Sequence, residues 1–169
     1  MAYVIFDLDG TVIDTSHRYR NLPCGTIDLD FWFANSTPEM IALDALLPLA
    51  DQMRNIYAAG HTVVICTARD FSPLNGVDLG AVYRQFLADN GLQHHALLHR
   101  SMAGPNHKEM GDGELKINLL ETYFKGEGFN SASEAFAIMF DDNLKVIEAM
   151  LDIGITCFDA TKQNARLAA

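Results

Sequence analysis

The 169-residue sequence is poor in cysteine and in basic residues, and both shortages exclude common classes of protein. Its three cysteines, Cys24, Cys66 and Cys157, lie far apart without a C-x-x-C spacing, which argues against a disulfide framework and a structural zinc site. The sequence has 12 Lys and Arg residues and 22 Asp and Glu residues, which gives a net charge of −10. This balance argues against binding along extended duplex nucleic acid, which requires a basic surface.

The sequence also lacks a long apolar run, a basic leader followed by an apolar stretch, and the P-loop string G-x-x-x-x-G-K-[ST]. We therefore expect no membrane-spanning segment, no secretion signal and no P-loop kinase domain. The expected location is the cytoplasm. Apolar residues make up 49% of the chain, enough for a sizeable core, and the length suits one domain over residues 1–169. Nothing in the sequence predicts the oligomeric state.

Short apolar runs alternate with segments of helical periodicity along the chain. The strands are expected at residues 3–7, 61–67, 92–100, 135–140 and 153–159. The helices are expected near 37–46, 48–59, 78–90 and 114–124, and from residue 144 onward. This alternation predicts an α/β fold, a three-layer Rossmann-like domain with a mainly parallel five-stranded sheet. The irregular segment 13–37 is expected to form a small cap or cover that includes a short helical piece.

Polar residues follow the ends of three expected strands. The first strand ends in Asp7-Leu8-Asp9-Gly10, and residues two apart on a strand share a face, so both carboxylates are expected to point the same way. Because the carboxyl ends of parallel strands meet at one sheet edge, where ligands bind, the polar groups are expected to converge there. The others are Thr67, Arg69, Asp141 and Asp142 at strand ends, and Lys116 early in a helix.

Each of these groups also has a structural explanation. A lone threonine at a strand end is usually structural, and a lysine early in a helix is usually a surface group. Asp141-Asp142-Asn143 can serve simply as an N-cap cluster for the helix that follows. What favours a functional site is that all the groups occur together, each in register with a strand end.

A site with four carboxylates favours one kind of chemistry. Four clustered carboxylates cannot all stay ionised without a counter-charge, and a hard, oxygen-preferring cation such as Mg²⁺ supplies it. With a metal and a nucleophilic carboxylate present, an aspartyl-phosphate intermediate becomes the leading reaction type. Thr67 can then donate to a phosphoryl oxygen, and Lys116 can offset the charge that develops in the transition state.

The same motifs, in the same order over nearly the whole chain, resemble the haloacid dehalogenase superfamily. The matching segments are Asp7-Leu8-Asp9-Gly10-Thr11-Val12, Cys66-Thr67-Ala68-Arg69, Lys116 and Phe140-Asp141-Asp142-Asn143. The resemblance implies that Asp7 attacks phosphorus, and that Asp9 protonates the leaving oxygen and then activates water. It also implies that Thr67 and Lys116 hold the phosphoryl group. The acidic residue at position 9 implies a phosphatase, because the dehalogenases have no acid there.

The resemblance also implies how Mg²⁺ is bound. The ligands would be the Asp7 carboxylate, the Asp9 backbone carbonyl, and Asp141 or Asp142. Which member of the Asp141–Asp142 pair contacts the metal directly is left open.

Further features resemble the 3′-phosphatase domain of phage polynucleotide kinases, a family that commonly has Arg where Asn143 stands. These features are Asp14, His17-Arg18, Trp32, Thr67-Ala68-Arg69, Arg100, Asp112-x-x-x-Lys116 and Asp141-Asp142-Asn143. This resemblance implies a nucleic-acid 3′-phosphate end or a nucleotide as the substrate. Candidate phosphate- or substrate-binding residues are Thr67, Ala68, Arg69, Lys116, Arg18 and Arg100. Surface ion pairing accounts equally well for Arg18 and Arg100.

Two other functions remain open on the sequence alone. The first is a phosphatase of free (deoxy)ribonucleotides or another small phosphorylated metabolite, which the acidic balance favours. The second is a binding module that keeps the fold without catalysis, although such a module needs no reactive groups at the strand ends.

Overall fold

The computed structural model describes residues 1–169 and contains a five-stranded sheet in the order β5-β4-β1-β6-β7. Every neighbouring pair of these strands is parallel. The strands are β1 (Tyr3–Phe6), β4 (Thr62–Thr67), β5 (Ala96–His99), β6 (Ile138–Asp141) and β7 (Thr156–Asp159). All five lie at or within a few residues of the predicted positions. The predicted α/β fold with a mainly parallel sheet is therefore confirmed.

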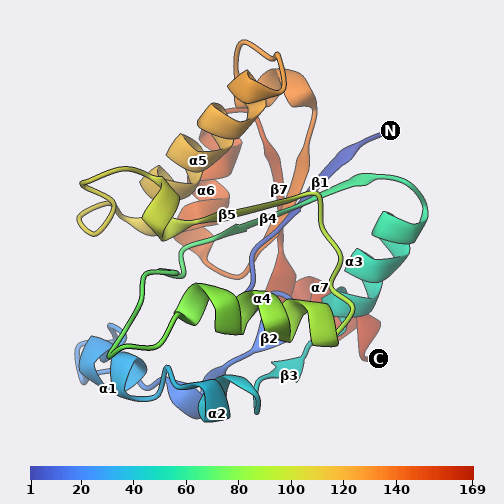
Figure 1. Ribbon diagram of the computed structural model, residues 1–169. Coiled ribbons are helices and arrows are strands. Elements are labelled where there is room, and N and C mark those ends of the chain that lie inside the picture. Colours follow the sequence, from blue (N-terminus) through green and yellow to red (C-terminus); the bar gives the residue numbers. More distant parts are fainter.

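Helices cover both faces of this sheet and complete the three layers (Figure 1). One face carries α3 (Leu49–Ala58), α4 (Leu79–Asp89) and α7 (Ala160–Leu167), and the other carries α5 (Asp112–Gly126) and α6 (Leu144–Asp152). None of the helices is both long and apolar enough to cross a membrane.

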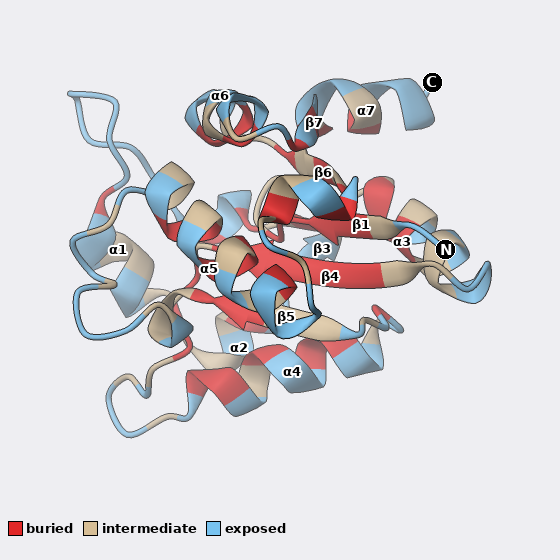
Figure 2. Ribbon diagram, turned by 90° about the horizontal axis from the view of Figure 1, so that it is seen from above, coloured by how far each residue is buried: buried red, intermediate tan, exposed pale blue.

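The alternation of side chains along the strands divides the core in two. In β1, Val4 and Phe6 pack toward α3 and α4, whereas Ile5 packs toward α5 and α6. The central strands β1 and β4 are buried on both faces, as Figure 2 shows in red. An apolar strand buried on both sides is typical of a parallel sheet, and it leaves only the strand ends for polar chemistry.

The predicted helix near 37–46 is wrong beyond its first turn. Helix α2 covers only Pro38–Ile41, and the chain then extends into β3 (Ala45–Leu46), which pairs antiparallel with β2 (Ile13–Asp14). Pro48 disfavours a helical conformation at the residue before it, and Pro48 itself has helical dihedral angles as the N-cap of α3. Helix α7, after the last strand, was not anticipated.

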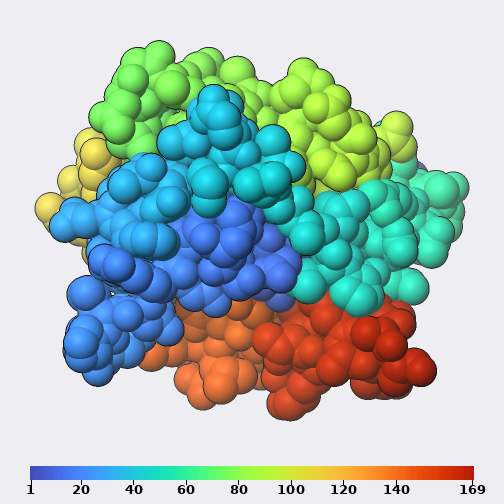
Figure 3. Space-filling model, turned by 90° about the horizontal axis from the view of Figure 1, so that it is seen from below, coloured from blue at the N-terminus to red at the C-terminus, as the bar shows by residue number.

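The segment 13–37 carries the short helix that its aromatic residues suggested, α1 (Leu29–Ala34), preceded by a 3-10 turn at Ser16–Arg18. Both ribbon views place α1 at the sheet end where β4 finishes and α5 begins. Seen from below, the chain from the end of β1 through α2 (blue to cyan) fills the surface between α4 and the C-terminal helices (Figure 3). We call residues 13–37 the cover segment.

Candidate active site

Asp7 lies directly after β1, where the strand passes from the core to the carboxyl edge of the sheet. Its backbone N–H donates to the carbonyl of Phe140 at 3.0 Å, which continues the pairing of β1 with β6. The residue is 5% exposed, and its carboxylate accepts a hydrogen bond from Lys116 Nζ at 2.7 Å. Burial raises the pKa of Asp7 well above its usual value, while Lys116 acts in the opposite direction.

Lys116 comes from the second turn of α5 and is buried between two carboxylates. Its ammonium group also donates to Asp141 Oδ2 at 2.7 Å. Burial alone would lower the pKa of Lys116, but Asp7 and Asp141 raise it above its usual value, so the ammonium form is retained. The lysine is therefore a fixed positive charge beside Asp7 and not a surface group.

Three carboxylates, from Asp7, Asp141 and Asp142, form an acidic cluster in which one oxygen atom from each residue lies within 4.8 Å of the others. Asp141 accepts from Lys116 and from the N–H of Asn143, whereas the Asp142 carboxylate accepts no hydrogen bond from another residue. Burial and the charge of Asp141 raise the pKa of Asp142 to about 6. One lysine does not neutralise this cluster, so these residues fit a hard divalent cation bound by oxygen ligands.

Gly10 closes the turn after Asp9 and makes room for Asp142. A Cβ atom at Gly10 would lie 2.3 Å from Asp142 Oδ2, and its φ of +69° belongs to the left-handed region that favours glycine. The turn is held by Leu8, whose carbonyl accepts from the N–H groups of Thr11, Val12 and Ile13.

The Asp9 carboxylate pairs with Arg69, whereas the Asp7 carboxylate pairs with Lys116. The two side chains diverge because β1 ends at Phe6 and Asp9 belongs to the turn that follows. Its two oxygens accept from Arg69 Nε and Nη2, both at 2.7 Å. Burial would raise the pKa of Asp9, but the charge and hydrogen bonds of Arg69 outweigh burial, and the pKa is lowered. In this arrangement Asp9 is an ionised carboxylate that a water molecule or a hydroxyl can approach, since its side chain is 31% exposed.

Thr67 ends β4 beside this pair and is fully buried. Its Oγ1 accepts from the N–H of Arg69 at 3.2 Å, which leaves the hydroxyl proton available to a phosphoryl oxygen. The carbonyl of Ala68 accepts from Arg100 Nε at 2.9 Å, so this residue connects the end of β4 to the segment after β5.

The structure brings most of the predicted site residues to one sheet edge, but Arg18 and Arg100 are engaged with other protein groups. The Arg100 guanidinium donates to the carbonyls of Ala68, His107 and Met110 and to Asp112, so it holds the loop before α5. Arg18 is fully buried and pairs with Asp44 at 2.6 and 2.8 Å. A role for either in substrate binding stays a prediction.

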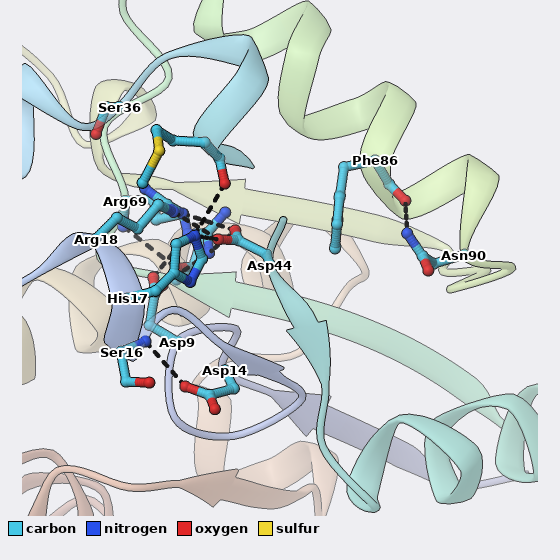
Figure 4. A network of polar contacts seen from close by, with 12 residues as sticks. Asp9, Asp14, Ser16, His17, Arg18, Ser36, Asp44, Arg69, Phe86 and Asn90 are labelled. Carbon is cyan, nitrogen blue, oxygen red and sulfur yellow. Dashed lines mark hydrogen bonds and ion pairs between the residues drawn. The ribbon is translucent and has the colours of Figure 1, made fainter. Parts of the chain in front are cut away.

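Two polar residues beside the site were missed from sequence. Asp44 lies between Arg18 and Arg69 (Figure 4). Asn164 of α7 donates to the carbonyl of Thr11 at 2.9 Å and accepts from the N–H of Leu49 at 2.8 Å, which ties α7 to the turn after Asp9. Neither lies in a motif. The only signal for Asp44 was one charged residue within an apolar stretch, and Asn164, among other polar residues, gave no signal.

A parallel sheet with Asp7, Thr67, Lys116 and the Asp141–Asp142 pair at its carboxyl edge is the arrangement expected from the resemblance to the haloacid dehalogenase superfamily. A haloacid dehalogenase-like hydrolase from Streptococcus pneumoniae has the same fold, with a TM-score of 0.60 and 13% identity over 93% of this chain and 83% of its own. The fold that the resemblance predicts is therefore confirmed.

More narrowly, the chain belongs to the bacteriophage T5 5′-deoxynucleotidase family, whose model matches residues 1–169. The 5′-deoxynucleotidase of Escherichia phage T5 is 28% identical over 169 residues, covering 95% of this chain and 68% of that protein. The chain is thus an enzyme of the phosphatase type. The finer resemblance to polynucleotide kinase 3′-phosphatases finds no support in these comparisons and stays a prediction.

Proposed function

We propose that this chain is an Mg²⁺-dependent phosphatase that removes the 5′-phosphate of deoxyribonucleoside monophosphates through an aspartyl-phosphate on Asp7. The observation that carries the proposal is the buried contact of Asp7 with Lys116 beside Asp141 and Asp142. The substrate class rests on the family, whose phage T5 member is a 5′-deoxynucleotidase. The proposal treats residues 1–169 as one catalytic domain and residues 13–37 as its cover.

In the first step, an oxygen of Asp7 forms a bond to phosphorus as the bond from phosphorus to the sugar O5′ breaks. Asp9 gives its proton to the departing O5′, so the deoxynucleoside leaves as an alcohol. The Arg69 ion pair favours ionised Asp9 in the free protein, whereas the negative charge of the entering phosphate favours the protonated form. We expect one Asp9 oxygen to stay bonded to Arg69 while the other carries the proton toward O5′. Lys116 and the Thr67 hydroxyl contact phosphoryl oxygens and offset their negative charge.

In the second step, ionised Asp9 takes a proton from a water molecule, whose oxygen attacks the phosphorus of the aspartyl-phosphate. The bond between Asp7 and phosphorus breaks, inorganic phosphate leaves, and Asp7 returns as a carboxylate. Mg²⁺ would be held by Asp7, the Asp9 backbone carbonyl, and Asp141 or Asp142, and it would supply positive charge that lets the phosphate approach a carboxylate.

Two other functions from the sequence differ in substrate or in class. Hydrolysis of nucleic-acid 3′-phosphate ends uses the same Asp7 chemistry, and it rests on the Thr67-Ala68-Arg69 and Asp112-x-x-x-Lys116 resemblance. A binding module without catalysis does not require Lys116 to be buried against Asp7, so the geometry favours an enzyme.

The experiment is phosphate release from matched substrates, each with Mg²⁺ and with EDTA. The substrates are deoxyribonucleoside 5′-monophosphates, the corresponding 3′-monophosphates, and 3′-phosphorylated oligonucleotides, with Asp7→Asn as the inactive control. We expect Mg²⁺-dependent release from the 5′-monophosphates. Release from the 3′-phosphorylated ends alone would replace our proposal with the end-processing activity, and no release from any ester would favour the binding module.

A further inference from the structure

Asp44 occupies a buried position between the two arginines that lie nearest Asp9. It follows α2 in the turn before β3, and its side chain has no exposed surface. Its oxygens accept from Arg18 Nε at 2.6 Å and Nη2 at 2.8 Å, and Oδ2 lies 3.5 Å from Arg69 Nη2. Figure 4 shows Asp44 between the two guanidinium groups.

Arg69 joins this pair to the active site. The same Nη2 atom that approaches Asp44 donates to Asp9 Oδ1, and the guanidinium carbon lies 4.6 Å from the centre of the Tyr83 ring. The Arg69 side chain is 2% exposed, so little water screens these charges. Asp9, Arg69, Asp44 and Arg18 thus form a row of alternating charges, which we call the ion-pair row.

The far end of the ion-pair row is held by the cover segment. The guanidinium carbon of Arg18 lies 4.5 Å from the centre of the Trp32 ring, and Trp32 belongs to α1. Arg18 Nη1 is buried without a hydrogen-bond partner, and His17 Nε2 lies 3.6 Å from Asp44 Oδ1. Asp44 therefore supplies the carboxylate that both arginines share, and its removal would leave Arg18 buried without a counter-charge.

We propose that Asp44 is a positioning residue, which together with Arg18 holds the Arg69 guanidinium and thereby orients the Asp9 carboxylate toward the leaving oxygen. This inference rests on the proposed role of Asp9 as the proton donor. It links the cover segment to the chemistry through the ion-pair row, and it gives Arg18 a positioning role instead of contact with the substrate.

The proposal predicts a loss that depends on the leaving group. Deoxyribonucleoside 5′-monophosphates have an alcohol leaving group that needs a proton from Asp9, whereas p-nitrophenyl phosphate releases a stable phenolate that does not. The value of kcat/KM covers steps only up to formation of the aspartyl-phosphate, so the later hydrolysis does not affect the comparison. We expect Asp44→Asn to lower kcat/KM for the 5′-monophosphates about 10- to 100-fold, and for p-nitrophenyl phosphate about threefold or less.

Two further variants serve as controls for the kinetics of Asp44→Asn. Asp28→Asn breaks the ion pair of Arg20 and Asp28 in the same cover segment while keeping a side chain that can cap α1, and it should leave both values unchanged. Asp9→Asn should reproduce the selective loss in a larger form, because it removes the proton donor itself. If Asp44→Asn lowers kcat/KM equally for both esters, the positioning role is overturned.

A second variant keeps the test valid if Asp44→Asn folds poorly. The double variant Arg18→Met with Asp44→Leu replaces a buried ion pair by apolar side chains, an exchange that proteins often tolerate. It should fold and show the same selective loss, and full activity on 5′-monophosphates in the folded double variant would also overturn the proposal. If the unmodified enzyme hydrolyses p-nitrophenyl phosphate but no 5′-monophosphate, the proposed substrate fails, and the comparison is made with an alkyl phosphate that the enzyme accepts.

Discussion

The ammonium nitrogen of Lys116 lies 2.7 Å from Asp7 Oδ1, and both groups are buried at the carboxyl edge of the sheet. The same nitrogen lies 2.7 Å from Asp141 Oδ2. One cation is therefore shared by two of the three carboxylates in the acidic cluster. A buried charge pair of this kind is costly to break on one side only, because the remaining charge stays in a medium of low dielectric constant.

Asp7→Asn is expected to lower turnover of any phosphomonoester by at least about 10³-fold, because an amide cannot form the aspartyl-phosphate. Steady-state phosphate release measures the loss, and acid quenching with labelled substrate should trap phosphate on the unmodified enzyme only. Asp159→Asn, at the end of β7 and bonded to Thr161 and Lys162, is the control that should keep activity. Trapped label on Asp7→Asn would assign the nucleophile to another residue.

Lys116→Met is expected to lower activity at least about 100-fold and to destabilise the metal-free protein by about 3–5 kcal/mol, because Asp7 and Asp141 lose their shared cation. Urea unfolding in EDTA and in Mg²⁺ measures the change, and Mg²⁺ should reduce it by supplying positive charge. Lys125→Met on the same helix is the control, since Lys125 is exposed and pairs only with Glu121. The control should stay within about 0.5 kcal/mol of the unmodified protein. An equal destabilisation with and without Mg²⁺ would argue against a cation at the acidic cluster.

Asp142 gives the metal-free protein a pH-dependent stability. Its pKa is raised to about 6 in the folded protein from about 4 when unfolded, so its ionisation opposes folding as pH rises from about 4 through 6. In EDTA, Asp142→Asn should match the unmodified protein near pH 4 and be more stable by about 2–3 kcal/mol at pH 7. Urea unfolding at several pH values measures this difference. In Mg²⁺ the unmodified protein should be the more stable of the two at pH 7, because a bound cation needs the ionised carboxylate. A stability difference in EDTA that does not change with pH would contradict the raised pKa.

The strand ends of the site could be predicted because the apolar pattern of a strand is local, and because strands that alternate with helices pair in parallel and so end at one sheet edge. Val4 to Phe6 is an apolar strand in sequence and in structure, and Asp7 follows from where it ends. Lys116 could be predicted from its motif, although its contacts could not. The position of Asp44 could not be predicted, because it depends on where the chain leaves α2 and on a partner 26 residues away.

The direction of the Asp9 side chain could not be predicted either. The rule that residues two apart share a face holds only within a strand, and β1 ends at Phe6. The direction of Asp9 is instead set by the turn around Leu8 and by Arg69, 60 residues later in the chain. Contacts of this range depend on the packed fold and leave no periodic signal in the sequence.

Gly10→Ala tests how closely the turn after Asp9 fits the acidic cluster. The added Cβ would lie 2.3 Å from Asp142 Oδ2, so the carboxylate must move, and the residue would also be strained at a φ of +69°. Gly60→Ala is the matched control: its φ is +82°, and nothing lies within 4 Å of the added Cβ. Both variants should lose about 1–2 kcal/mol from backbone strain.

Only Gly10→Ala should also weaken Mg²⁺ binding and lower kcat, because only it displaces a carboxylate of the cluster. Calorimetric titration with Mg²⁺ and thermal unfolding of the two variants separate the effects. A normal Mg²⁺ affinity in Gly10→Ala would mean that Asp142 does not bind the cation directly, and Asp141 would then be the ligand from this pair.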